Sequence, residues 1–194
     1  MIFPIVAYGD PVLRKVAVDI DKNYPQLQTL IKDMFETMNN ASGVGLAAPQ
    51  IGKSIRLFII DASPFADKDL DEMDNVGSTD LATFKKVFIN AKIMQEDGED
   101  WKFNEGCLSI PKIREDVFRK PTLKISYLDE HFVHHEETYD GIAARIIQHE
   151  YDHIDGKLFV DRISPLKKQL LTSKLNKIAK GQVDTDYKMR FPNR

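Results

Sequence analysis

The sequence predicts a single globular domain of mixed α and β structure. Its 194 residues suit one domain, and 42% hydrophobic with 29% charged residues is the balance of a globular protein with a real core. Some segments repeat apolar residues at helical spacing, whereas shorter ones are rich in β-branched and aromatic residues. We expect one catalytic domain at residues 1–181, followed by a polar C-terminal tail at 182–194.

Three segments are expected to be helical. Residues 25–39 repeat apolar residues along one helical face. A second helix is expected between Asp140, which can cap it, and Gly156, a good C-terminal stop. A last helix starts at Ser164 and runs to about Lys180. Its apolar side is expected to comprise Leu166, Leu170, Leu171, Leu175 and Ile178.

The expected strands share runs of β-branched and aromatic residues. Residues 55–61 read as a mostly buried strand, and a polar turn at 95–100 joins a strand at 84–94 to a returning strand at 101–104. Further strands are expected at 117–121, 123–128 and 132–139.

Residues 62–80 differ in composition from the rest of the chain. They contain six acidic residues and show little periodicity, which predicts an acidic surface loop. The carboxylates could bind calcium, but their spacing does not fit the helix–loop–helix calcium pattern, so a solvated loop is favoured.

Charge and hydropathy argue against several classes of partner. The net charge of −3 does not favour DNA or anionic membranes. No apolar run approaches the ~20 residues of a transmembrane helix, and the first residues do not read as a signal peptide. The single cysteine, Cys107, excludes an intrachain disulfide and fits a reducing compartment. We therefore expect a cytoplasmic protein.

The run at residues 148–153, Gln-His-Glu-Tyr-Asp-His, contains an H-E-x-x-H pattern. On a helix, residues four apart share a face, so His149 and His153 can direct two imidazoles at one metal ion. Glu150 lies beside them and can exchange a proton with a metal-bound water. The plain alternative is a surface helix that carries two histidines by chance. Ionisable groups on an inward helix face are costly unless they coordinate or pair, and this favours the metal site.

A metal held by two histidines needs a third protein ligand. The further histidine of the longer zincin motif is absent after His153. A lone cysteine is usually a small buried hydrophobe. Near this motif, however, Cys107 could supply a thiolate and leave a fourth position for water, as in a catalytic site. The other candidates are acidic side chains and the histidines His131, His134 and His135, which we expect to face solvent.

Residues 43–52 contain three glycines and two alanines, so the backbone can approach another group closely. A phosphate loop would need a glycine in place of Ala47, and a structural turn is the plainer alternative. If this loop meets the cysteine segment at the metal, the Gln50 side chain and the Leu108 amide could stabilise an oxyanion.

Three segments together resemble the motifs of the peptide deformylases. Residues 43–50 (Gly-Val-Gly-Leu-Ala-Ala-Pro-Gln), 105–109 (Glu-Gly-Cys-Leu-Ser) and 148–153 occur in the family's order. The long final helix and the run at 109–111 resemble type I members, which are common in Gram-negative bacteria. The stretch at 62–80 is longer than compact members need between the first two motifs.

The resemblance implies a hydrolase that removes the N-formyl group from the formyl-methionine of nascent bacterial or organellar polypeptides and releases formate. It also implies an α+β fold, with mixed or antiparallel sheets around the helix that carries the motif, an N-terminal helix and a long C-terminal helix. One divalent metal ion is implied, Fe(II) above all, with zinc, nickel or cobalt in the isolated protein. Metal-bound hydroxide would attack the formyl carbonyl, with Glu150 as general acid and base.

The resemblance assigns further roles to residues of this sequence. The implied metal ligands are Cys107, His149 and His153. The implied oxyanion donors are Gln50 and the Leu108 amide. Gly45 and Gly106 would bind the substrate backbone as a strand does. The methionine pocket would be lined by Val44, Ile142 and Ile146, with Arg114 near the later substrate residues.

Two rival functions share part of this site. An H-E-x-x-H metallopeptidase that cleaves internal bonds would use the same metal and Glu150, but Cys107 in a loop argues against it. A module with a structural metal normally uses four protein ligands and more thiolates.

The last helix carries five lysines, with no acidic residue between 164 and 181. They could simply stabilise the helix C-terminus or dock the helix onto an acidic partner or RNA. The family's work on nascent chains suggests the ribosome.

Overall fold

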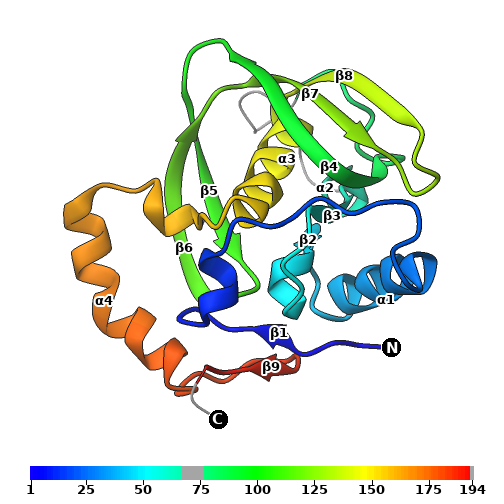
Figure 1. Cartoon of the computed structure of the whole chain (residues 1–194). Helices are drawn as coiled ribbons and strands as arrows, with labels where there is room; N and C mark the ends of the chain where they lie inside the picture. The colour runs from blue at the N-terminus through cyan, green and yellow to red at the C-terminus, as the bar shows by residue number, and fades with distance from the viewer. Residues whose placement is uncertain (67–76, 193–194) are drawn as a thin grey trace.

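The computed structural model describes residues 1–66 and 77–192, which form an α+β structure (Figure 1). The main sheet is antiparallel and has the strand order β2-β3-β4-β7-β8. The α+β class with antiparallel sheets is therefore confirmed. The strands of the main sheet are β2 (Gly45–Ala47), β3 (Leu57–Asp61), β4 (Lys85–Asp97), β7 (Thr122–Leu128) and β8 (His134–Asp140).

The helices lie close to their predicted ranges. α1 begins at Leu27 rather than at residue 25, because Gln26 has a left-handed backbone with φ of 54°. None of the helices in the described ranges is long and apolar enough to cross a bilayer. The α-helices are α1 (Leu27–Asn40), α2 (Ser63–Ala66), α3 (Gly141–Ile154) and α4 (Pro165–Ala179). Short 3₁₀ helices occupy η1 (Pro11–Arg14), η2 (Ala48–Ile51) and η4 (Phe159–Asp161).

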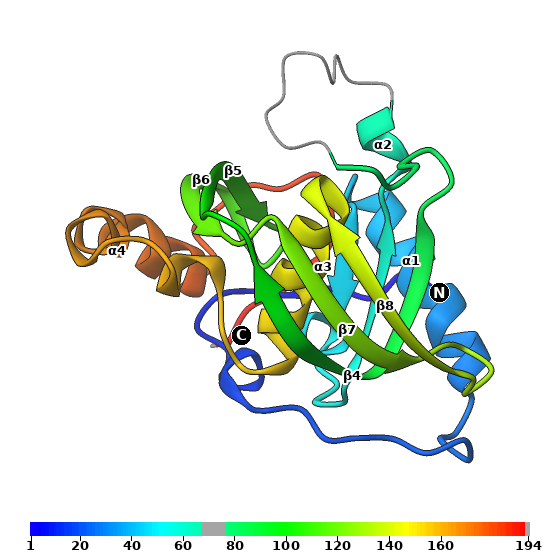
Figure 2. The same ribbon diagram turned by 90° about the horizontal axis from the view of Figure 1, so that it is seen from above.

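Helix α3 packs against the main sheet and contacts β2 and β3 (Figure 2). Its apolar residues, such as Ile142 and Ile147, belong to the largest buried core cluster. Asp140 occupies the N-cap position, but its side chain does not cap the helix. The carboxylate instead accepts hydrogen bonds from the amide and hydroxyl of Ser78, at 2.8 and 2.9 Å. The predicted side-chain cap is therefore wrong, because a loop distant in sequence takes up the carboxylate.

Strands β5 (Trp101–Cys107) and β6 (Ile110–Arg119) form a separate antiparallel hairpin. The sequence predicted only the part of this hairpin away from its tip, at 101–104 and 117–121, because residues 105–116 include glycine, proline and several charged residues. The register slips next to Cys107, which pairs with Ile110, and residues 108–109 form the turn. The hairpin thus places Cys107 at its tip.

Residues 182–192, the described part of the predicted tail, do not form a free tail. Strand β9 (Met189–Arg190) pairs in parallel with β1 (Ile5–Val6), so the chain returns from α4 to the N-terminal segment (Figure 1). Our description of 182–194 as a polar tail needs this correction. The strand has little local signal, because it contains only two residues and its parallel partner lies far away in the chain.

Two other predictions concern surface segments. Residues 67–76 of the predicted acidic loop at 62–80 lie outside the described residues. On α4, Leu171, Leu175 and Ile178 are buried as predicted, but Leu166 and Leu170 are 67% and 73% exposed. Helix α4 stands away from the main sheet (Figure 2) and contacts β6. Only part of its apolar surface is therefore covered, and Leu166 and Leu170 remain outside the covered part.

Candidate metal centre and active site

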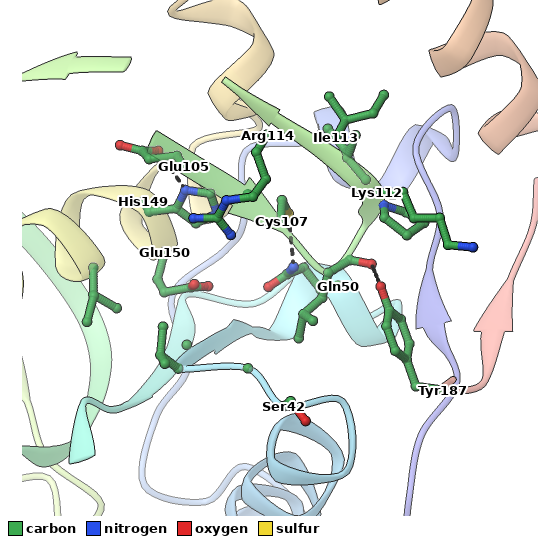
Figure 3. A pocket seen from close by; sticks show the side chains of 18 of the residues that line it. Ser42, Gln50, Glu105, Cys107, Lys112, Ile113, Arg114, His149, Glu150 and Tyr187 are labelled. Carbon is green, nitrogen blue, oxygen red and sulfur yellow. Dashed lines mark hydrogen bonds and ion pairs between the residues drawn. The ribbon is translucent and has the colours of Figure 1, made fainter. Parts of the chain in front are cut away.

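Cys107, His149 and His153 converge at one point, although they come from two elements. One ligand atom from each lies within 4.8 Å of the others. The Cys107 Sγ is 3.3 Å from His153 Nε2. Helical spacing places both imidazoles on one face of α3, and the tip of the β5–β6 hairpin brings the thiol to them. Figure 3 shows two members of this set, Cys107 and His149.

The surroundings favour the ionised thiol. Burial alone would raise the pKa of Cys107, but the charges of His153 and His149 and their hydrogen bonds outweigh it and lower the pKa to about 5. Burial likewise disfavours the charged His149 ring, yet Cys107 and Glu105 together raise its pKa well above the usual value. A thiolate is the form of cysteine that binds metals, so the ligand is ready at neutral pH.

Glu105 orients the first histidine. It is 4% exposed, and its Oε2 accepts a hydrogen bond from His149 Nδ1 at 2.9 Å. Burial opposes ionisation of Glu105, but hydrogen bonds from Arg119 and His149 hold its pKa well below the usual range. Because Nδ1 is engaged, Nε2 of His149 is left for a metal. Carboxylates commonly orient metal-binding histidines in this way.

Two buried arginines complete the charge balance around Glu105. Arg119 donates to both carboxylate oxygens at 2.7 and 2.9 Å, and Arg145 donates at 3.0 Å. Arg119 also bonds Asp152 of α3 at 2.7 Å. No role was predicted from the sequence for Arg119, Arg145 or Asp152. Arg145 carried a usable signal, because it lies four residues before His149 on the inward helix face.

Glu150 has the properties expected of a proton carrier. It is 4% exposed, and its Oε2 has no hydrogen-bond partner in the described structure. Burial is the largest influence on its pKa and raises it to about 7. Gly45 faces it so closely that a Cβ there would lie 2.4 Å from Glu150 Oε1. The glycine therefore makes room for the carboxylate.

The loop that contains Gln50 meets the cysteine segment as expected. Gln50 Oε1 accepts a hydrogen bond from the Ala47 amide at 2.8 Å, which turns the Nε2 group towards the site. Nε2 lies 3.5 Å from Cys107 Sγ and 3.3 Å from Ser109 Oγ. Leu108 follows Cys107 in the turn at the tip of the hairpin. Both predicted oxyanion donors thus border the three-residue cluster.

A cavity of about 450 Å³ opens beside the cluster (Figure 3). Most of the predicted substrate residues line it, namely Val44, Gly45, Gly106, Arg114 and Ile146. Ile142 does not: it is fully buried in the core cluster below the cavity, one helical turn from Ile146. Among the lining residues that were not predicted are Phe65, Phe103 and the segment at 184–187. Nothing in the sequence linked residues so far apart in the chain.

The other histidines lie away from this cluster. His134 bonds Ser126 at 2.8 Å and His135 bonds Asp129 at 2.8 Å, both on or beside β8. His131 and His134 are exposed. The expectation that this stretch faces solvent holds for these two residues, whereas His135 is half-buried against Tyr127.

The residues present fit a divalent metal ion. One thiolate and two imidazoles are suitable ligands for zinc or another divalent transition metal, and three protein ligands leave a position open for water or substrate. Two buried polar atoms at this site, Oε2 of Glu150 and Nδ1 of the ligand His153, have no hydrogen-bond partner among the described residues. Such orphaned atoms are rare in protein interiors and are common at functional sites.

Comparisons with known proteins agree with this site. Residues 2–169 match the family model described as polypeptide deformylase. A peptide deformylase of Christiangramia forsetii is 59% identical over 193 residues, covering 100% of this chain and 97% of the relative. One of Flavobacterium johnsoniae is 57% identical, covering 98% and 96%.

Solved structures point the same way. A peptide deformylase from Legionella pneumophila is 38% identical with a TM-score of 0.76, covering 94% of this chain and 98% of that one. An inhibitor complex of the Plasmodium falciparum enzyme is 31% identical with a TM-score of 0.75, covering 91% and 99%. Family model, relatives and structures agree over almost the whole chain, and so this chain belongs to the peptide deformylase family.

Proposed function

We propose that this peptide deformylase removes the N-formyl group from the formyl-methionine of nascent polypeptides with a divalent metal ion held by Cys107, His149 and His153. One observation carries the proposal. The three ligand atoms lie within 4.8 Å of one another, next to a buried Glu150 oxygen that has no partner in the described structure. This arrangement supports hydrolysis rather than structural metal binding, because three ligands leave a coordination position open.

The metal, when bound, supplies Lewis acidity that makes water a nucleophile near neutral pH. The chain's own residues do the rest. Glu150 takes a proton from the attacking water and later gives it to the leaving amine. Gln50 Nε2 and the Leu108 amide hold the formyl oxygen as it gains negative charge. The products are formate and a free amino terminus.

The cavity supports an extended peptide with an apolar first side chain. Val44 and Ile146 line it together with the aromatic rings of Phe65 and Phe103. We assign the methionine side chain to this apolar wall. Gly45 and Gly106 leave the backbone accessible for strand-like pairing with the substrate. Arg114 is placed near the later residues of the peptide.

The assay for this function measures formate released from a formyl-Met peptide. We expect release from this peptide and none from the acetyl-Met or free-amine peptide of the same sequence. Internal cleavage without formate would instead identify an H-E-x-x-H metallopeptidase. Glu150→Gln keeps the shape of the side chain but cannot act as a base, so it should retain the metal and lose about 10²–10⁴-fold in kcat. Full activity in Glu150→Gln would disprove the mechanism.

We propose ferrous iron as the native metal. Cysteine and histidine ligands also suit zinc, so the donor set supports a transition metal without selecting one. Iron content after anaerobic purification, measured together with formate release, tests the choice. An enzyme that is fully active with stoichiometric zinc and no iron would refute it.

We further propose that the enzyme works in the cytoplasm and that α4 docks on the ribosome. Two of the five lysines on α4 and its C-cap are already paired within the chain: Lys167 with Glu115 at 2.9 Å and Lys168 with Asp161 at 2.6 Å. The free lysines are Lys174, Lys177 and Lys180, which are exposed and have no ion pair in the described structure.

The docking test reverses these three charges and leaves the chain length intact, because the residues after α4 pair with β1. Changing all three to Glu should abolish co-sedimentation with ribosomes while formate release continues. The matched control reverses three exposed lysines elsewhere, Lys15, Lys22 and Lys92. Co-sedimentation that survives the α4 changes would count against the docking face.

A further inference from the structure

The segment at 182–190 forms part of the wall of the active-site cavity. It leaves α4, lines the cavity with residues 184–187 and then enters β9 (Figure 1). The family model matches residues 2–169, so this wall lies beyond the matched range. The Christiangramia forsetii relative matches over 100% of this chain, so its match includes the segment.

Tyr187 is the residue of this segment that reaches the reacting region. Its hydroxyl donates a hydrogen bond to the Leu108 carbonyl at 2.8 Å (Figure 3). Burial raises the pKa of Tyr187 well above its usual value, so the hydroxyl keeps its proton throughout the working pH range. The ring is half-buried and packs against the core cluster to which Leu108 also packs.

The turn that receives this bond carries two of the proposed functional groups, the Cys107 thiolate and the Leu108 amide. Segments far apart in the chain hold it. The Tyr8 amide donates to the Ser109 carbonyl at 2.8 Å, and Gln50 Nε2 lies 3.3 Å from Ser109 Oγ. Tyr187 holds the remaining carbonyl of the two-residue turn. Without its hydroxyl the peptide plane after Leu108 would be free to rotate towards solvent.

Tyr187 is itself firmly placed. Thr185 Oγ1 donates to the Tyr187 carbonyl at 2.9 Å, and the Ile5 amide donates to the Lys188 carbonyl at 2.9 Å. Further on, the Arg190 guanidinium packs so tightly against Gly52 that a Cβ there would lie 2.7 Å from it. The backbone of Tyr187 is thus held by the Thr185 hydroxyl before it and by the pairing of β9 with β1 after it.

We propose that Tyr187 is a positioning residue for deformylation, which sets the turn at 108–109 and, through it, the Cys107 thiolate and the Leu108 amide. The proposal rests on the function proposed above. Because Tyr187 bonds the turn and no reacting atom, its effect is on geometry. A misplacement of a catalytic group by about 1 Å can cost about a hundredfold in rate, and the loss of one bond to a turn is a smaller disturbance.

Tyr187→Phe removes only the hydroxyl. We expect kcat for the formyl-Met peptide to fall about tenfold while KM changes less than about twofold, since the oxyanion contact matters most in the transition state. The second readout needs no turnover. In the cobalt-substituted protein, the thiolate-to-cobalt absorption band should shift, because the Cys107 geometry changes.

The matched control is Tyr24→Phe. Tyr24 is also half-buried and packs against the same core cluster, and its hydroxyl has no hydrogen bond in the described structure. It should behave as the parent enzyme does. A Tyr187→Phe protein with parental kcat and an unshifted cobalt band would overturn the proposal, as would a fall in thermal stability alone. If the parent released no formate, the proposed function would fail, whereas a shifted cobalt band would still support the positioning role.

Discussion

Gly45 leaves room for the Glu150 carboxylate, because glycine has a hydrogen atom where other residues have a Cβ. Glu150 must lie close to the metal ligands and stay dry to keep its pKa near 7, and Gly45 supplies the space. Any larger residue on β2 would compete with the carboxylate for the same volume. Glycine inside a strand generally weakens the strand, so its presence here is explained by the space it leaves for Glu150 and not by strand propensity.

Gly45→Ala should therefore impair turnover more than folding. The added Cβ would stand 2.4 Å from Glu150 Oε1, so the carboxylate must move away. A displacement on the order of 1 Å predicts a loss of roughly a hundredfold in kcat. Metal content should be unchanged, because the atoms nearest to the added Cβ all belong to Glu150, which is not a proposed ligand. Formate release and metal analysis on the same sample check this, and parental kcat in the Gly45→Ala enzyme would contradict it.

At this scale, the sequence could predict residues whose chemistry is written in local spacing. His149 and His153 follow from helical periodicity, and Glu150 from its place between them. The roles of Glu105 and Tyr187 could not be predicted. Each acts through a partner at least 44 residues away, His149 for Glu105 and Leu108 for Tyr187, and only the fold brings the pairs together.

At the scale of elements, a buried ion network joins the β5–β6 hairpin to α3. Glu105 of β5 bonds Arg119 of β6 and both Arg145 and His149 of α3. Removing one partner from such a buried group leaves uncompensated charge, which costs more than the intact pair gains. The network therefore fixes the angle between the two elements that supply the metal ligands.

Glu105→Gln should lower both stability and metal affinity. Loss of the negative charge leaves two buried arginines with less compensation, and we expect the free energy of unfolding to fall by about 3–5 kcal/mol. Metal affinity should fall about 10–100-fold, because His149 loses its orienting carboxylate. Urea unfolding and metal titration measure the two effects.

Glu115→Gln is the control for this change. Glu115 lies on β6 of the same hairpin, but its partner Lys167 is 45% exposed, so removing it should alter stability by less than about 1 kcal/mol. Equal effects in the two variants would mean that the buried network has no special role.

Asp161 ties α4 to the N-terminal segment and predicts an acid-sensitive contact. Burial opposes its ionisation, but hydrogen bonds from Arg14 and Lys168 outweigh this and lower its pKa from 3.8 to about 2. A lowered folded pKa contributes stability that is present above the unfolded value of 3.8 and is lost as the pH falls through the folded value. The contribution is modest, about 1 kcal/mol, since the pair is partly exposed.

Asp161→Asn should therefore unfold at a lower urea concentration than the parent at pH 5–7. The gap should narrow below about pH 4 and be mostly lost near pH 2, because the parent carboxylate becomes protonated as well. Metal-free protein is used, so that metal release does not contribute. A gap that stays constant down to pH 2 would remove Asp161 as the cause.

Elements with long apolar periodicity could be predicted, whereas elements held by distant partners could not. Helix α1 and strand β3 appear close to their expected ranges. The middle of β6 was missed because the adjacent charged residues Glu115 and Asp116 interrupt its alternation, and β9 because it exists only through β1. Propensity is a local quantity, and these two strands are formed by tertiary contacts.

Over the whole molecule, the site lies where three core clusters come together. Helix α3 belongs to the first, Leu108 packs against the second and Cys107 packs against the third. The metal ligands therefore come from parts of the chain that pack into different core clusters. A metal bound between them should link these clusters and stabilise the native state as a whole.

This linkage can be measured as metal-dependent unfolding. A ligand at 100 times its dissociation constant adds about 2.7 kcal/mol, which corresponds to a rise in Tm of roughly 5–10 °C for a domain of this size. The parent should show this rise when nickel or zinc is added to metal-free protein, and a chelator should reverse it. Cys107→Ala removes one ligand, so most of the rise should disappear. Glu150→Gln should keep it, because Glu150 is not in the proposed ligand set. An undiminished rise in Cys107→Ala would exclude the thiolate as a ligand, while its loss in Glu150→Gln would make that carboxylate a ligand instead of a base.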